Sequence, residues 1–180
     1  MGYTWEAWAL APQRLVDELA TPSVRPDQVR AALTSPAPTG VLDRWDEVAT
    51  ALAAAGGAPL VGDVADHVVL LVRALGRFAG SVAHTSSGGA WFREELMATR
   101  VGGLVGPDVA AHLVDRALAG LVVREWPGLG WLTGEECARA AAAGGAFVGG
   151  DDDEGADDVW VVLDALARGA REGGLVTLYL

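Results

Sequence analysis

The stretch LVTLYL (residues 175–180) combines β-branched and aromatic residues with an alternating pattern, and it predicts a β-strand at the end of the chain. Residues 3–10, YTWEAWAL, also alternate and contain three aromatic residues, which predicts a second strand. Each segment is amphipathic and too short to be stable as an isolated strand. We therefore expect the two strands to pair in one small sheet, which brings the ends of the chain together and decides the fold.

The residues between these strands predict six to seven helices. The strongest pattern covers residues 63–78, whose apolar arc is wider than half of the helix, so we expect this helix to be central. A capping box, Thr133-Gly-Glu-Glu136, begins another helix. Helices are also expected from Pro12, from Pro26, over residues 41–55, over 107–119, and from Asp157 or Asp158 to the glycines at 173–174. Packed around the terminal strands, these helices predict a single α+β domain over residues 1–180.

The charge of the chain restricts its partners. There are 13 basic and 24 acidic residues, and the net charge is −11. A nucleic-acid backbone would be repelled, so we expect no nucleic acid and, if the partner is a protein, a cationic one. Every basic residue is arginine, which is typical of a GC-rich genome and leads us to expect an actinobacterial source. The absence of lysine excludes a lysine Schiff-base mechanism.

The compartment follows from cysteine use and hydropathy. Cys137 is the only cysteine and cannot form an internal disulfide, which favours a reducing cytoplasm. The strongly apolar run at residues 68–72 is far too short to span a membrane, and the first residues lack the basic region of a secretory signal. We expect a cytoplasmic protein with no membrane partner.

Several polar clusters suggest metal or thiol chemistry, and each has a simpler interpretation. The acidic run at residues 151–158 does not match a calcium loop, because the sixth position is alanine and the twelfth is valine. Asp108, His112 and Asp115 would share one helical face, but a solvated polar face has the same spacing. Cys137 is expected to be a buried, inert thiol. We expect no metal and no cofactor.

The stretch GSVAHTSSGGAWFREE (residues 80–95) is the main candidate site. His84 is expected on a short strand beside the core, and Glu94 and Glu95 return towards it after a glycine turn. This arrangement could supply acid–base catalysis. Trp91 and Arg93 are the candidate contact residues for a ligand or partner. The alternative is a packed hairpin or turn with solvated charges.

A second candidate is WPGLGW (residues 126–131). Trp126 and Trp131 flank a Pro-Gly-Leu-Gly turn, and the two indoles could form an aromatic wall for a ligand or partner. The alternative is a loop held down by its own aromatic side chains.

Four motifs together resemble an uncharacterised actinobacterial domain-of-unknown-function family: GSVAH (80–84), GAWF (89–92), WPGLGWLTGEE (126–136) and GLVTLY (174–179). In that family the third motif is closer to FPxIGxLT and the last to LVTFYY. The chain is also distantly similar to the small YfbM-like α+β proteins. The resemblance implies a single cytoplasmic domain and no particular activity.

Two functions remain open. The first is a non-enzymatic protein-binding factor, of the immunity type or an accessory protein, which the acidic charge and the lack of a recognised catalytic motif favour. The second is a small tailoring or hydrolytic enzyme of a biosynthetic cluster, with a small-molecule substrate, that uses His84 with Glu94 or Glu95.

Overall fold

The computed structural model describes residues 3–33, 39–54, 62–84, 91–118, 128–149 and 155–180. Within them, one antiparallel sheet holds four strands, β1 (Tyr3–Ala9), β2 (Arg77–His84), β3 (Gly128–Thr133) and β4 (Gly174–Tyr179), in the order β2-β1-β4-β3. β1 and β4 pair directly, with Trp5 opposite Tyr179 and Ala9 opposite Leu175. The predicted pairing of the two terminal strands is confirmed.

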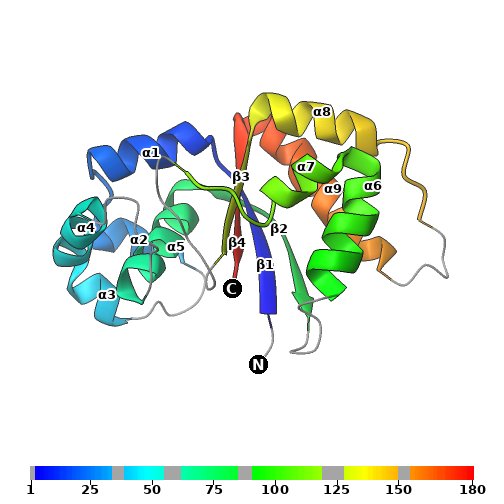
Figure 1. Cartoon of the computed structure of the whole chain (residues 1–180). Helices are drawn as coiled ribbons and strands as arrows, with labels where there is room; N and C mark the ends of the chain where they lie inside the picture. The colour runs from blue at the N-terminus through cyan, green and yellow to red at the C-terminus, as the bar shows by residue number, and fades with distance from the viewer. Residues whose placement is uncertain (1–2, 34–38, 55–61, 85–90, 119–127, 150–154) are drawn as a thin grey trace.

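Helices cover both faces of the sheet, which Figure 1 shows edge-on between two helical layers. One layer contains α1 (Pro12–Ala20), α2 (Pro26–Ala32), α3 (Thr39–Asp43), α4 (Trp45–Ala54) and α5 (Asp63–Leu75). The other contains the π-helix η1 (Trp91–Val101), α6 (Gly102–Val105), α7 (Pro107–His112), α8 (Gly134–Gly144) and α9 (Ala156–Glu172). The α+β class is therefore confirmed.

The three layers explain the sequence of the terminal strands. In β4, Leu175 and Tyr179 pack into the core that contains α8 and α9, whereas Val176 and Leu178 pack into the core that contains α5. All six residues of β4 are buried, because the strand lies inside the sheet with a helical layer on each side. A strand in this position must be apolar on both faces, as LVTLYL is.

Two predicted helices end earlier than expected, and part of a predicted turn forms a strand. The central helix ends at Leu75 rather than Phe78, because Arg77 and Phe78 belong to β2. The helix from Pro107, predicted to reach residue 119, ends at His112. Residues 128–130, predicted as part of a turn, belong to β3. The carbonyl of Leu113, which a longer helix would use, instead accepts hydrogen bonds from Trp5 Nε1 (3.1 Å) and Thr177 Oγ1 (2.7 Å). Tertiary partners thus replace the next helical turn.

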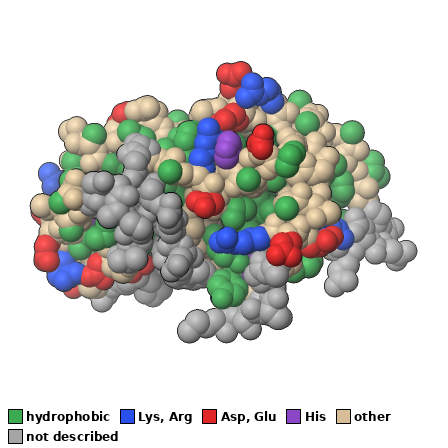
Figure 2. All heavy atoms as spheres, in the orientation of Figure 1, with side chains coloured by type: hydrophobic (Ala, Val, Ile, Leu, Met, Phe, Trp, Pro, Cys, Tyr) green, Lys and Arg blue, Asp and Glu red, His purple; other side chains and the backbone are tan. Residues whose placement is uncertain are grey.

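None of the helices in the described residues has the length and apolar character needed to cross a bilayer. On the face that Figure 2 displays, carboxylates and arginines are interspersed rather than separated into patches of one sign. The net negative charge is therefore spread over this face and not gathered into one continuous acidic surface.

Candidate functional site

His84 lies within a cluster of aromatic rings at one end of the sheet. It is the last residue of β2 and pairs with Tyr3, the first residue of β1, while Tyr179 ends the neighbouring strand β4. Trp91 and Phe92, at the start of η1, complete the group. We call Tyr3, His84, Trp91, Phe92 and Tyr179 the sheet-end cluster. The pairing of strand ends, and not proximity in sequence, brings these side chains together.

The rings of the sheet-end cluster are stacked around the imidazole. The centroid of His84 is 5.2 Å from that of Phe92, with 14° between the ring planes, and 5.7 Å and 5.9 Å from those of Tyr3 and Tyr179. Phe92 and Tyr179 are buried, whereas Tyr3, His84 and Trp91 are half-buried. The cluster therefore has a buried floor and a partly exposed outer side, and stacked neighbours fix its rings.

One arginine and one hydroxyl group set the polar environment of the sheet-end cluster. The exposed Arg93 places its guanidinium carbon 5.2 Å from the centroid of the Tyr179 ring, a cation–π contact. Burial raises the pKa of the Tyr179 hydroxyl although Arg93 opposes the shift, so this hydroxyl is neutral at pH 7. The hydroxyl lies 3.5 Å from Nε2 of His84. The imidazole thus has a neutral polar neighbour on one edge and aromatic faces around it.

One carboxylate near His84 is a residue that the sequence did not indicate. Asp158, in the first turn of α9, has its pKa raised by burial and by Asp157, while His84 and Arg100 lower it. Asp158 therefore lies within electrostatic reach of the imidazole. Nothing in the spacing of the sequence connects it to His84, because only the packing of α9 on β2 brings them near each other.

The two predicted carboxylates, Glu94 and Glu95, are both exposed on η1. Glu95 pairs with Arg100, with Oε1 3.4 Å from Nε. Residues 91–101 form a π-helix, which the sequence did not predict. Contacts five residues apart follow its period, including the hydrogen bond from Thr99 Oγ1 to the Glu94 carbonyl (2.7 Å). The structure thus brings Trp91 and Arg93 to His84 and its neighbours, and turns Glu94 and Glu95 outward.

The second predicted site receives less support. Trp126 lies outside the described residues. Trp131 lies on β3, at the sheet edge opposite β2. The guanidinium carbon of Arg116 is 3.6 Å from the centre of one of its rings, and the indole Nε1 donates to the Ala117 carbonyl (3.0 Å). Arg116 therefore already covers one face of the Trp131 indole. A ligand that stacks on an aromatic wall would need such a face to be free.

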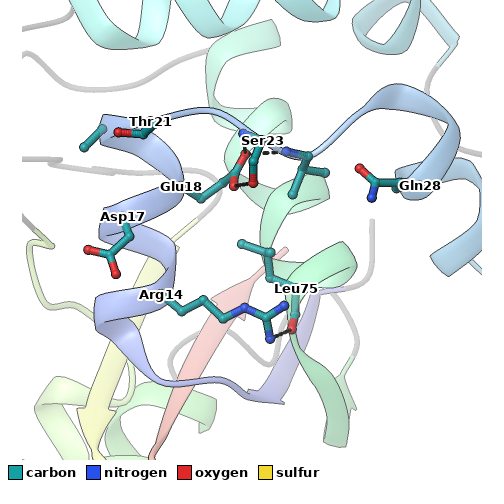
Figure 3. Close-up of a pocket in the computed structure, with 9 residues that line it drawn as sticks. Arg14, Asp17, Glu18, Thr21, Ser23, Gln28 and Leu75 are labelled. Atoms are coloured by element: carbon teal, nitrogen blue, oxygen red, sulfur yellow. Dashed lines mark hydrogen bonds between the residues drawn. The ribbon is translucent and has the colours of Figure 1, made fainter.

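A cavity of about 560 Å³ opens between α1 and α2 (Figure 3), and its polar side chains are engaged with the protein itself. Arg14 donates to the Leu75 carbonyl (3.2 Å), and Glu18 accepts from the backbone of Ser23 (2.6 Å) and Val24 (2.7 Å) and from the Ser23 hydroxyl (2.6 Å). Gln28 accepts from the backbone of Arg25 (2.7 Å). These contacts hold the connection between α1 and α2 in place. The polar side chains of this cavity therefore have a structural role, and we do not assign a ligand to it.

Metal and thiol chemistry find no support in the described part of the chain, where no three His, Cys, Asp or Glu side chains are placed to hold a metal ion. Cys137 is buried, as predicted. Burial and the adjacent Glu136 raise the pKa of its thiol to about 12, so the thiolate is not populated at neutral pH.

No family model, curated protein or solved structure matches this chain. The resemblance to an actinobacterial family therefore stays a prediction, and the function has to be inferred from the residues.

Replacing His84 with alanine tests whether the imidazole is structural. We expect a loss of about 1–3 kcal/mol in the free energy of unfolding, because the ring stacks on Phe92 and fills the centre of the sheet-end cluster. Thermal or urea denaturation of the purified variant measures the loss. A variant as stable as the wild type would contradict the structural role and would favour the enzyme hypothesis, in which the histidine is kept for chemistry.

Proposed function

We propose that this protein is a non-enzymatic binding protein, of the immunity type or an accessory factor, that binds a basic protein partner through the sheet-end cluster. The observation that carries the proposal is the half-buried state of Tyr3, His84 and Trp91 above the buried Phe92 and Tyr179. Aromatic residues fixed by neighbouring rings supply a large contact area at low entropic cost. Such residues dominate the binding energy of protein interfaces.

The charges around the cluster support a basic partner. Glu94 and Asp157 are exposed and adjoin Arg93 and Asp158 along the chain, two residues that lie near the cluster. The chain as a whole carries a net charge of −11. A basic surface would be attracted over long range and oriented by these carboxylates as it approaches. The aromatic faces would also accept an arginine or lysine side chain through cation–π contacts.

The positions of the glutamates support binding rather than catalysis. Acid–base chemistry with His84 would need Glu94 or Glu95 to point at the imidazole or at a shared substrate. Both side chains are instead exposed, and Glu95 is paired with Arg100. The same outward orientation suits a charged rim around an interface, where carboxylates meet a partner's basic groups.

Affinity capture from an extract of the native host tests the proposal. We expect the wild-type protein to retain a basic partner that is released by raised salt, and Trp91→Ala to weaken binding of that partner at least about tenfold. Titration of the captured partner against each purified variant, by calorimetry, gives the affinities.

Two matched variants control for nonspecific effects. Trp160→Ala removes a tryptophan of α9 that is 43% exposed and lies outside the cluster, and it is expected to leave the affinity unchanged. Glu94→Gln should weaken binding at low salt, whereas Glu135→Gln, on exposed α8 surface, should not. The proposal is wrong if Trp91→Ala binds like the wild type, or if no captured protein responds to salt.

A further inference from the structure

A second cavity, at the opposite end of β2 from His84, has a strongly basic lining. It has a volume of about 290 Å³, and its walls come from the start of β2 and the last turns of α9. Three of its six lining residues are arginines: Arg77 from the strand, and Arg168 and Arg171 from the helix. Residues three apart share one face of a helix, so Arg168 and Arg171 present their guanidinium groups together. Ala9, Phe78 and Glu172 complete the lining.

Arg168 and Arg171 differ from the other arginines in the described residues. Each of the others has a hydrogen bond, an ion pair or a cation–π contact within the protein, whereas these two have none. The partnered arginines are Arg14, Arg25, Arg30, Arg44, Arg73, Arg77, Arg93, Arg100, Arg116 and Arg139. Both unpartnered cations line the same cavity, in a chain whose net charge is −11.

The charges in this cavity match a dianion. Glu172 accepts from Arg77 at 3.1 Å, so these two groups neutralise each other. Arg168 and Arg171 then leave two positive charges without a counter-charge in the cavity. Like charges at this helical spacing repel, and a ligand with two negative charges would relieve the repulsion. Arginine is also the side chain best suited to bind phosphate oxygens in pairs.

The end of α9 explains part of this arrangement but not all of it. Basic side chains near a helix C-terminus stabilise the helix dipole, which accounts for the presence of Arg168 and Arg171 there. It does not account for Arg77, which reaches the same cavity from a strand. Because the dipole at this end repels anions, the arginine side chains must supply the attraction. Removing Arg168 and Arg171 should therefore weaken the binding of an anion.

Phe78 gives the cavity an apolar wall. Its side chain is 51% exposed, and Trp8 holds it in an edge-on contact with ring centroids 5.4 Å apart. A bound phosphate would fill only part of the cavity, which leaves room for an organic group beside the ring. We propose that this cavity binds a small phosphate monoester, with the phosphate between Arg168 and Arg171 and the organic group against Phe78. This site is separate from the sheet-end cluster and does not rest on its function.

Calorimetric titration of the full chain with phenyl phosphate and with inorganic phosphate, at low ionic strength, tests the proposal. We expect phenyl phosphate to bind at millimolar concentrations or below, and more tightly than inorganic phosphate. The double variant Arg168→Gln/Arg171→Gln should bind phenyl phosphate at least about tenfold more weakly, because both unpartnered guanidinium groups are lost. Both positions are exposed, so the variant should fold like the wild type, which a thermal melt verifies.

Two further variants separate the phosphate contacts from the wall. Phe78→Ala should reduce the affinity for phenyl phosphate several-fold and leave that for inorganic phosphate unchanged. Arg139→Gln, an exposed arginine on α8, controls for the loss of charge and should change neither affinity. Equal binding by the wild type and the double variant, or no binding of phenyl phosphate at millimolar concentrations, would overturn the proposal. Equal affinities for the two probes would overturn the role of Phe78.

Discussion

Gly130→Ala is expected to destabilise the fold by at least about 3 kcal/mol. A Cβ atom at this position of β3 would lie 2.5 Å from Thr177 Oγ1, 2.6 Å from the carbonyl oxygen of His112 and 2.6 Å from the carbonyl carbon of Leu113. Two of these atoms are backbone and cannot rotate away, because Leu113 is held by Trp5 and Thr177. The midpoint of urea denaturation, with an unchanged slope, measures the loss.

Gly103→Ala is the matched control. This glycine lies on α6, is exposed, and has no heavy atom within 4 Å of the position that a Cβ would occupy. Alanine is a better helix former than glycine by up to about 1 kcal/mol, so this variant should be as stable as the wild type or slightly more stable. If Gly130→Ala also retained wild-type stability, the close approach of β3 to the residues after α7 would be wrong.

The sequence predicts the centre of this fold well because its strands obey a simple pattern. β1 alternates, and its buried positions Trp5, Ala7 and Ala9 all enter the core beneath α9. β4 is apolar at nearly every position because it has neighbours on both edges and helices on both faces. These patterns do not depend on distant residues, so they can be recognised without knowing what packs against them.

The π-helix η1 could not be predicted in this way, because the spacing of its buried residues differs from that of an α-helix or a strand. Its buried residues are Phe92, Leu96, Met97 and Val101, at spacings of four, five and nine from the first. An α-helix would place apolar residues at three, four and seven, and a strand at every second position. Neither template fits, and the preceding glycines at 88 and 89 favour a turn. Only the packing of these four side chains on the core stabilises the wider helix.

The candidate site could be predicted in part. The stretch at residues 80–95 identifies His84, Trp91 and Arg93, because histidine, aromatic and charged residues lie close together in sequence. Tyr3 and Tyr179 enter the cluster through the register of β1 with β2 and β4, which a single sequence does not give. Arg168 and Arg171 likewise gain significance only when α9 brings them beside Arg77. Site residues that lie close together in the sequence could therefore be predicted, whereas those that only the packing brings together could not.

His67 is a buried group whose titration should lower the stability of the protein in mild acid. It lies on α5 with 2% of its surface exposed, and its ring centroid is 3.9 Å from that of Trp45. The Nδ1 atom is buried and has no hydrogen-bond partner. Burial lowers the pKa of the imidazole to about 4, although the charge of Glu18 acts in the opposite direction. The folded protein therefore holds a neutral histidine that the unfolded chain would protonate more readily.

Acid should destabilise the protein in the window between the two pKa values of His67. Above pH 6.5 the imidazole is neutral in both states, and its contribution to stability is fully present. As the pH falls from 6.5 to about 4, the unfolded state binds a proton that the folded state excludes, and about 3 kcal/mol of stability is lost. Urea denaturation at pH 7.5 and at several values down to pH 4 measures this slope.

His67→Leu separates this effect from other titrations. Leucine is apolar and of similar size, so the variant should stay folded at pH 7 and lose most of the acid sensitivity between pH 6.5 and 4.5. Glu136 titrates at lower pH than His67. Burial raises the pKa of its carboxyl, but hydrogen bonds from Arg116 and Thr133 lower it to about 2. Its contribution to stability is therefore lost only as the pH falls below its ordinary value of 4.5. Equal slopes for the variant and the wild type above pH 4.5 would show that His67 is not the group that acid titrates, and that α5 is not packed as tightly as its burial indicates.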